Sequence, residues 1–317
     1  MFGTGPFAVP TFEALIESPH DVAALFTRPI VDSGKRRKTA ENPTRDVAES
    51  AGLSVFDPMS VNDPMSVEQL LALNADLFVV CDYGQILSRE CLAASKLGGI
   101  NLHGSLLPKY RGAAPINWAI FQGDPVTGIT IIHMTSKLDG GPCLVKAETK
   151  IGSQETAEQI EPRLAQLGVA PVLEAIEILK NWDGDSSIGE SQNPALATRA
   201  PRLKKSDGEI NWSRSAVEIV NQIRAFQPWP GTFTTWSSEK LKQPLRIIVH
   251  QATVLPTEKE SASQAPGSIV VSDGHDLIIQ TGSGQIAIET VQPAGKRVMP
   301  IEDFLRGRAP AIGDHFQ

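Results

Sequence analysis

The sequence predicts an α/β protein in which a doubly wound parallel sheet is followed by a small β-barrel or sandwich. Over residues 1–182, short apolar runs alternate with helical stretches, a pattern typical of a sheet covered by helices. Beyond residue 206, several short β-prone runs are separated by turn residues. A polar stretch interrupted by Gly and Pro lies between them. We therefore expect domains at 1–182 and 206–317, joined by a linker at 183–205.

The strands of the first domain are expected where the chain is apolar on both faces. They are residues 21–27, 75–83, 98–103 and 128–134, and helices are expected at 44–52, 66–74 and 113–124. A last long helical pattern covers residues 156–181. Pro162 and Pro171 lie inside it and predict a helix start and a kink or break.

The second domain is expected to begin with a helix and to continue as strands. The helical pattern covers residues 215–226, and the β-prone runs are residues 231–236, 245–255, 267–272, 276–282 and 284–293. Many short strands at close spacing are typical of a barrel or a sandwich.

The N-terminal residues match the loop that normally follows a first strand. Residues 3–8 read GTGPFA and open a helix, but almost nothing precedes them, so the first strand is expected to be missing from a shortened chain. Because that strand is central in a doubly wound sheet, its loss would leave buried backbone groups unpaired. The same letters fit the loose dinucleotide-binding pattern, but a tight glycine turn from strand to helix is the favoured interpretation.

Composition narrows the class of protein and its compartment. The net charge is −7, so a polyanionic partner would have to be bound by local basic patches. Cys81, Cys91 and Cys143 fit a reducing compartment and no disulfide framework, and no Cys/His spacing predicts a metal site. No apolar run would span a membrane and no secretory signal is evident, so we expect no membrane partner and a cytoplasmic or organellar-matrix location.

Asn101 and His103 are the first candidates for chemistry. They lie two residues apart at the end of an expected strand, so both side chains share one face. Ligands of open α/β sheets bind beyond the carboxyl ends of the strands. There an imidazole can transfer protons and an amide can stabilise an oxyanion, although a histidine in such a place is also often structural.

Asp139 and a basic cluster are two further candidates. Asp139 follows the strand at 128–134, where its carboxylate could hold the imidazole of His103, or simply begin the turn at Gly140. Lys35, Arg36, Arg37 and Lys38 form the densest positive run, which is either a solvated surface loop or a loop that contacts phosphates.

Several motifs together resemble a known family. The motifs are GTGPFAVP at 3–10, NLHGSLLPKYRGAAPINWAI at 101–120, GITI at 128–131 with LDGGP at 138–142, APRLKKSDGEINW at 200–212, IRAFQPWPG at 223–231 and VQPAGKRVM at 291–299. Along almost its whole length the chain resembles the methionyl-tRNA formyltransferases, a family of folate-dependent formyltransferases. At Gly140 and Pro142 it departs from the family, which usually has threonine and an acidic residue there.

The resemblance implies an activity, a fold and a set of site residues. The family transfers a formyl group from 10-formyltetrahydrofolate to the α-amino group of methionine on initiator tRNA. It has a Rossmann-like folate-binding domain, here 1–182, and a small OB-like barrel that supports the tRNA, here 206–317. The family's catalytic residues map onto Asn101, His103 and Asp139, and a monomer without a metal is expected.

The resemblance also implies two sets of binding residues. The folate pocket corresponds to Ser105, Leu106, Leu107 and Pro108, and to the loop of Tyr83, Gly84, Gln85, Ile86 and Leu87. The family's basic loop near the N-terminus, which meets the tRNA acceptor arm, corresponds to Lys35, Arg36, Arg37 and Lys38.

Two other functions fit part of this pattern. A folate-dependent formyltransferase acting on another amine, such as a nucleotide sugar or an amino-ribonucleotide, would share the catalytic block but not the motifs at 223–231 and 291–299. A non-catalytic RNA-binding relative would have no need for an intact set of Asn101, His103 and Asp139.

Overall fold

The chain folds into two compact units, each described by itself. The computed structural model describes residues 1–30, 41–238, 241, 243–256, 264–308 and 310–317. Unit 1 comprises Met1–Pro115, Val126–Lys150 and Gln159–Pro201, and unit 2 comprises Ile116–Pro125, Ile151–Glu158 and Arg202–Gln317. None of the described helices is both long and apolar enough to cross a bilayer.

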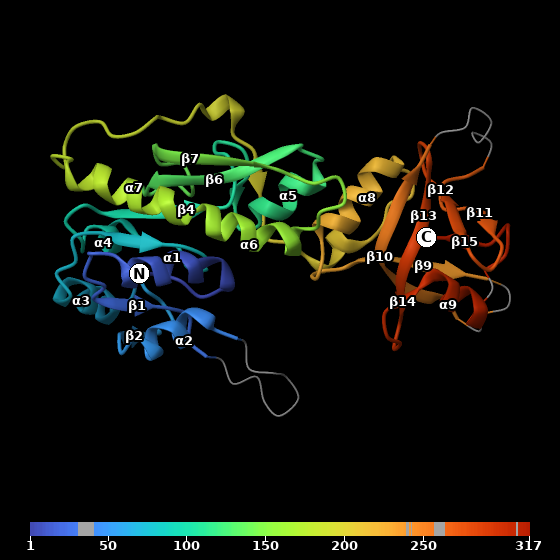
Figure 1. Ribbon diagram of the computed structural model, residues 1–317, viewed down its shortest axis with the longest axis horizontal. Helices are drawn as coiled ribbons and strands as arrows, with labels where there is room; N and C mark the ends of the chain where they lie inside the picture. Colours follow the sequence, from blue (N-terminus) through green and yellow to red (C-terminus); the bar gives the residue numbers. More distant parts are fainter. Residues whose placement is uncertain (31–40, 239–240, 242, 257–263, 309) are drawn as a thin grey trace. The chain divides into compact units, whose positions relative to one another are not determined.

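Unit 1 is built on a mixed sheet with helices beside it (Figure 1). Its strands are β1 (Ala24–Phe26), β2 (Ser54–Phe56), β3 (Phe78–Val80), β4 (Gly99–His103), β5 (Arg111–Gly112), β6 (Val126–His133), β7 (Cys143–Lys150) and β8 (Arg199–Ala200). Its helices are η1 (Pro6–Ala8), α1 (Val9–Glu17), α2 (Pro43–Ser50), α3 (Pro64–Ala72), α4 (Arg89–Leu92), most of α6 (Ala157–Leu167), α7 (Val169–Lys180) and η2 (Pro194–Leu196).

The place of the first strand is taken by the opening residues of the chain. No strand is assigned before β1 in the described residues, yet Phe2 forms parallel bridges to both Val80 and Phe26. The Phe2 amide donates to the Val79 carbonyl, and the Phe26 amide donates to the Met1 carbonyl. The sequence predicts unpaired backbone groups beside a missing first strand, and this prediction is wrong. The short extended segment at the start of the chain is enough to pair these backbone groups of β1 and β3.

Aromatic packing holds this short segment in place. Phe2 is 1% exposed, and its ring lies 5.1 Å from Phe26, 5.1 Å from Phe78 and 5.3 Å from Tyr83. Burial of a phenylalanine side chain contributes about 2 kcal/mol or more, with a further contribution from each well-oriented aromatic pair. The segment thus joins β1 and β3 into one continuous layer.

The second half of the sheet is antiparallel, which corrects the expectation of an all-parallel sheet. β3 and β4 are parallel, but β4 pairs antiparallel with β6, and β6 pairs antiparallel with β7. β6 and β7 are joined by a short loop, and such a connection produces an antiparallel hairpin. The carboxyl end of β6 consequently lies beside the amino end of β4, where His133 pairs with Ile100.

The long helical pattern at 156–181 divides into α6 and α7 at Gly168, although neither predicted proline lies at the break. Pro162 lies inside α6 and Pro171 near the start of α7. A Cβ on Gly168 would come within 2.6 Å of the Leu102 side chain, so the helices approach β4 closely at this point. Leu102 therefore points to the helical face of the sheet.

Unit 2 is dominated by an antiparallel barrel, as the sequence predicts (Figure 1). Its elements include η3 (Lys205–Gly208), α5 (Pro115–Phe121, all but its first residue), α8 (Ala216–Ala225), β9 (Thr232–Ser237), β10 (Leu245–Leu255), β11 (Ile269–Ser272), β12 (Leu277–Gln280), β13 (Gln285–Pro293), β14 (Met299–Pro300), α9 (Ile301–Gly307) and β15 (His315–Phe316). The strands run in the order β11-β12-β13-β10-β9-β15, and a bridge between Ser268 and His315 brings the two ends together.

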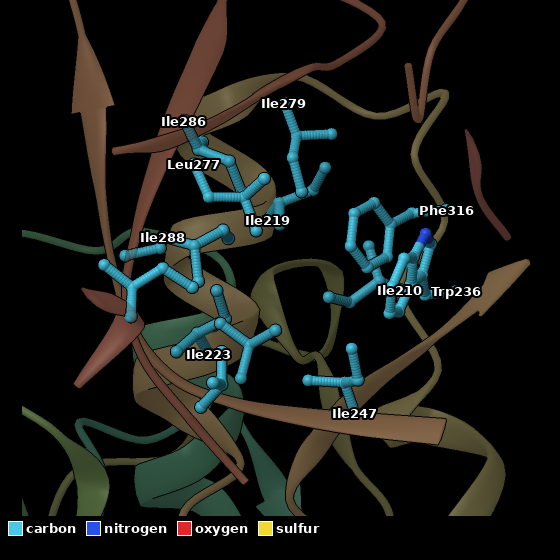
Figure 2. Packing of buried hydrophobic residues seen from close by; sticks show 14 of the residues in the cluster. Ile210, Ile219, Ile223, Trp236, Ile247, Leu277, Ile279, Ile286, Ile288 and Phe316 are labelled. Carbon is cyan, nitrogen blue, oxygen red and sulfur yellow. The ribbon is translucent and has the colours of Figure 1, made fainter. Parts of the chain in front are cut away.

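The barrel encloses its own apolar core, shown in Figure 2. Ile219 and Ile223 from α8 meet Ile247, Ile286 and other inward-facing strand residues there. α8 begins with a capping box, in which the Ser215 hydroxyl accepts from the Glu218 amide and the Glu218 carboxylate accepts from Ser215. The sequence therefore fixes both the start of this helix and the face that it buries.

Candidate active site

His103 ends β4 with its imidazole buried and its orientation fixed. The side chain is 5% exposed, and its Nε2 lies 2.9 Å from the carbonyl oxygen of Tyr110. A carbonyl oxygen only accepts hydrogen bonds, so this contact requires a hydrogen on Nε2. The other ring nitrogen, Nδ1, is therefore the one available for transferring a proton or donating to a substrate.

Asp139 faces that second nitrogen. Its Oδ2 lies 3.8 Å from Nδ1 of His103, a distance that suits an ion pair but is too long for a hydrogen bond. The same oxygen accepts a hydrogen bond of 2.8 Å from the Gly112 amide. Asp139 has a φ of 47°, a left-handed conformation that aspartate tolerates better than most residues. The carboxylate is thus held beside the ring, where it favours positive charge on the imidazole during proton transfer.

Asn101 lies on the same face of β4 as His103. Leu102, between them, points to the opposite face at Gly168. Asn101 is half-buried, and in the described part of the chain its side chain makes no hydrogen bond to protein. Its amide is therefore free to donate to a substrate oxygen beside the imidazole.

Asp139 reaches His103 by a different route from the one expected. Because β6 is antiparallel to β4, Asp139 does not lie at the carboxyl end of a neighbouring parallel strand, and that expectation is wrong. It belongs to the loop between β6 and β7, which begins beside the amino end of β4 and returns to the imidazole. The expected proximity of His103 and Asp139 is confirmed, although the topology that was to produce it is not.

The loop after His103 is anchored to β6 by Thr130. This buried hydroxyl donates to the Ser105 carbonyl at 2.7 Å and accepts from the Leu107 amide at 3.0 Å. Ser105 is fully buried and its own hydroxyl donates to the Lys109 carbonyl. Ser105 and Leu107 thus stabilise the loop, while Leu106 lies half-buried against Gly128. Half-buried Pro108 follows them in the same loop.

The loop at 82–87 lies at the same edge of the sheet as His103, because β3 and β4 are parallel and Val80 pairs with Asn101. Among the described residues, no backbone amide of this loop donates a hydrogen bond to another residue. Gly84 has a φ of 80°, which only glycine adopts easily, and Ile86 is 68% exposed. The loop therefore presents unpaired amides beside an apolar side chain.

The loop at 82–87 is anchored to the rest of unit 1 by its own side chains. Gln85 accepts from the Val61 amide and donates to the Pro58 carbonyl, so its side chain has a structural role. Tyr83 and Leu87 are almost fully buried, and the Tyr83 hydroxyl is buried without a hydrogen-bond partner in the described residues. A ligand at this edge would therefore meet mainly the backbone of the loop.

Several residues that the sequence analysis did not single out complete the site. Tyr110 and Gly112 contact His103 and Asp139 directly, and Gln192 and Thr198 hold the loops that carry them. The only signal for Gly112 was its place in a Pro/Gly-rich block, and Gln192 had none because it lies in the expected linker.

The remaining candidates are accounted for as follows. Lys35, Arg36, Arg37 and Lys38 lie outside the described residues. His133, the histidine at the end of β6, packs structurally, with Nε2 2.8 Å from the Leu97 carbonyl and its ring 5.1 Å from that of Trp182. In the described ranges, no three His, Cys, Asp or Glu side chains are arranged to hold a metal ion.

Comparison with known proteins gives the family of this chain. A family profile described as "Formyl transferase" matches residues 1–176, and one described as "Formyl transferase, C-terminal domain" matches residues 202–309. A methionyl-tRNA formyltransferase of Rhodopirellula baltica is 44% identical over 321 residues, covering 99% of this chain and 94% of that protein. The chain belongs to the methionyl-tRNA formyltransferase family. A methionyl-tRNA formyltransferase of Coxiella burnetii is 41% identical, and the match covers 98% of this chain and 95% of that protein.

Solved structures share the fold of this family at lower identity. An N-formyltransferase from Helicobacter canadensis, in complex with folinic acid and dTDP-3-aminofucose, aligns with a TM-score of 0.63 at 17% identity. The match covers 90% of this chain and 96% of that one. HypX from Aquifex aeolicus, in complex with tetrahydrofolic acid, aligns with a TM-score of 0.54 over 82% of this chain and 43% of that one. These matches support the architecture of a sheet unit followed by a barrel.

Proposed function

We propose that this chain transfers the formyl group of 10-formyltetrahydrofolate to the α-amino group of methionine on initiator tRNA. The observation that carries the proposal is the placing of His103 beside Asp139. One ring nitrogen donates to the Tyr110 carbonyl, and the other faces the carboxylate at 3.8 Å. Asn101 lies on the same face of β4 as His103. The relatives that establish the family of this chain are named methionyl-tRNA formyltransferases.

The chemistry needs one bond to form and one to break. The methionine nitrogen attacks the formyl carbon, which gives a tetrahedral intermediate with a negative oxygen. The bond from that carbon to N10 of the folate then breaks, and the proton lost by the attacking amine is taken up at N10. Asn101 and His103 donate to the developing oxyanion, and the imidazole carries the proton from one nitrogen to the other. Asp139 stabilises the charged ring.

The folate fits the loop at 82–87. A pterin has an edge of hydrogen-bonding groups and two flat faces. The loop supplies backbone amides without protein partners and the exposed side chain of Ile86. We infer that Tyr83, Gly84, Gln85, Ile86 and Leu87 contact the pterin mainly through their backbone. The segment of Ser105, Leu106, Leu107 and Pro108 shapes the wall that ends at His103.

The tRNA would be held by positive charge away from the reacting atoms. Phosphate contacts by Lys and Arg provide most of the affinity for a nucleic acid. We assign this role to Lys35, Arg36, Arg37 and Lys38, with exposed residues of the second unit such as Lys204, Lys205, Lys296 and Arg297 adding contacts. Under this proposal residues 1–182 carry catalysis, 183–205 connect, and 206–317 support the tRNA.

The test is formyl transfer by His103→Ala, with methionyl initiator tRNA and a nucleotide amino sugar offered as separate acceptors. Loss of one oxyanion donor typically costs about 100- to 1000-fold in rate, so kcat should fall by at least that order while tRNA binding is kept. His275→Ala, which changes an exposed turn histidine, is the matched control and should keep wild-type turnover. Near-normal turnover by His103→Ala would rule out the catalytic role assigned to His103. Activity with the nucleotide amino sugar alone would show that this sugar, and not methionyl-tRNA, is the acceptor.

A further inference from the structure

Residues 189–200, which we call the strap, lie against both loops of the catalytic pair. The strap was expected to be part of a linker, yet it pairs with unit 1 at both ends. Glu190 forms an antiparallel bridge with Cys143, and β8 pairs in parallel with β5. Between these two points the strap reaches the Asp139 loop and the Tyr110 loop.

Gln192 fixes the Asp139 loop through its side-chain amide. Its Nε2 donates to the carbonyl of Asp139 at 2.8 Å and to that of Gly141 at 2.7 Å. Its Oε1 accepts from Nε and Nη2 of Arg111 at 3.0 and 2.7 Å. Every donor and acceptor of the amide is therefore used, and the group links the loop before β7 to Arg111 of β5.

Thr198 fixes the loop that contacts the other side of the pair. Its hydroxyl accepts from the Tyr110 amide at 2.9 Å, and its carbonyl accepts from the Arg111 amide at 2.9 Å. The Tyr110 carbonyl is the group that binds Nε2 of His103, and the Gly112 amide binds Oδ2 of Asp139. The strap thus reaches both catalytic side chains through one intervening backbone group each.

We propose that Gln192 and Thr198 are positioning residues, which hold Asp139 and His103 at their working separation through the strap. The inference rests on the proposed formyl transfer. Neither residue touches a reacting atom, so each acts through the backbone that it holds. The separation matters because a displacement of about 1 Å at reacting groups can cost roughly 100-fold in rate. Supporting hydrogen bonds of this kind hold the reacting groups of a rigid site close to their productive positions.

The chain offers variants that separate positioning from general stability. Gln192→Glu keeps an oxygen for Arg111 but turns a carboxylate oxygen toward the two carbonyls that Nε2 now binds. Thr198→Val removes the acceptor for the Tyr110 amide, and Thr198→Ser retains it. Asn193→Ala is the matched control, because among the described residues the Asn193 side chain accepts only from the Ala195 amide, which lies within the strap.

The experiment measures kcat and KM for both substrates, the melting temperature, and the ring proton signals of His103 by NMR. We expect Gln192→Glu and Thr198→Val to lower kcat about 100-fold while both KM values change by less than about 3-fold. The His103 ring signals, assigned by their loss in His103→Ala, should move in these two variants. They should stay in place in Asn193→Ala and Thr198→Ser, which should also keep wild-type kcat.

The outcomes separate this inference from the proposed function. Wild-type kcat or unmoved His103 signals in Gln192→Glu and Thr198→Val would overturn the positioning role. An equal loss of kcat in Asn193→Ala would also overturn it, because the strap would then matter only for stability. If the wild-type chain transfers no formyl group, the proposed function fails. The NMR comparison still decides whether the strap positions the imidazole.

Discussion

Changing Asp139 to Asn deletes one negative charge while keeping the local structure. Asparagine retains an oxygen that can accept from the Gly112 amide, and it tolerates the left-handed backbone found there at a φ of 47°. What is lost is the charge 3.8 Å from Nδ1 of His103. The variant therefore tests the electrostatic role of Asp139 with little change of shape.

The size of the effect follows from that distance. At 3.8 Å and an effective dielectric constant of about 20, a carboxylate and an imidazolium attract by about 4 kcal/mol. If all of it stabilised the transition state, its loss would lower the rate by about 1000-fold. Because Asp139 is 11% exposed and water partly screens it, we expect a loss of kcat of about 100- to 1000-fold.

Single-turnover formyl transfer with saturating folate and methionyl-tRNA measures this step directly. Asp76→Asn is the control, since Asp76 is an exposed carboxylate paired with Lys96 on the surface. The control should keep wild-type turnover, and both variants should melt within a few degrees of the wild type. A rate for Asp139→Asn within about 3-fold of wild type would refute the electrostatic role, because so small a loss corresponds to less than about 1 kcal/mol.

Three further substitutions test the framework of the site by denaturant unfolding and activity. Gly112→Ala should lower the free energy of unfolding by at least about 2 kcal/mol, because φ is 130° and the new Cβ would overlap the Ala200 carbonyl; unchanged stability would contradict this. Phe2→Ala should cost about 3 to 5 kcal/mol, because the ring is 1% exposed among three aromatic neighbours; a cost below about 1 kcal/mol would show that the segment is loosely packed. Thr130→Val should cost about 1 to 3 kcal/mol by leaving the Leu107 amide unpaired, whereas Thr130→Ser should cost less; a smaller loss in Thr130→Val than in Thr130→Ser would show that the methyl group matters more than the hydroxyl.

The sequence was informative wherever a local pattern decides the structure. β4 could be predicted because residues 98–103 form a β-prone run, and period-two alternation was enough to place Asn101 and His103 on one face. The helical pattern at 215–226 and the closely spaced β-prone runs after it predicted the helix and barrel of the second unit. In each case the determining residues are close together in sequence.

The features that the sequence did not predict depend on contacts between distant residues. The direction of β6 is decided by its hairpin with β7 and its pairing to β4, and an apolar run alone carries no direction. Phe2 replaces a whole strand because three aromatic rings from other segments surround it. Gln192 contacts carbonyl oxygens 53 and 51 residues away, and nothing in its neighbourhood signals that role.

The position of the strap has a consequence for how the protein becomes active during synthesis. Asn101, His103 and Asp139 leave the ribosome well before Gln192 and Thr198, so a nascent chain can bury its sheet while its reacting groups are still unrestrained. Domains fold as units in the order of synthesis. Under the positioning proposal, the last stretch of the first unit is the one that holds Asp139 and His103 at their working separation. A shortened chain ending near residue 182 would carry Asn101, His103 and Asp139 and still turn over poorly, and full activity would require the synthesis of residues 189–200.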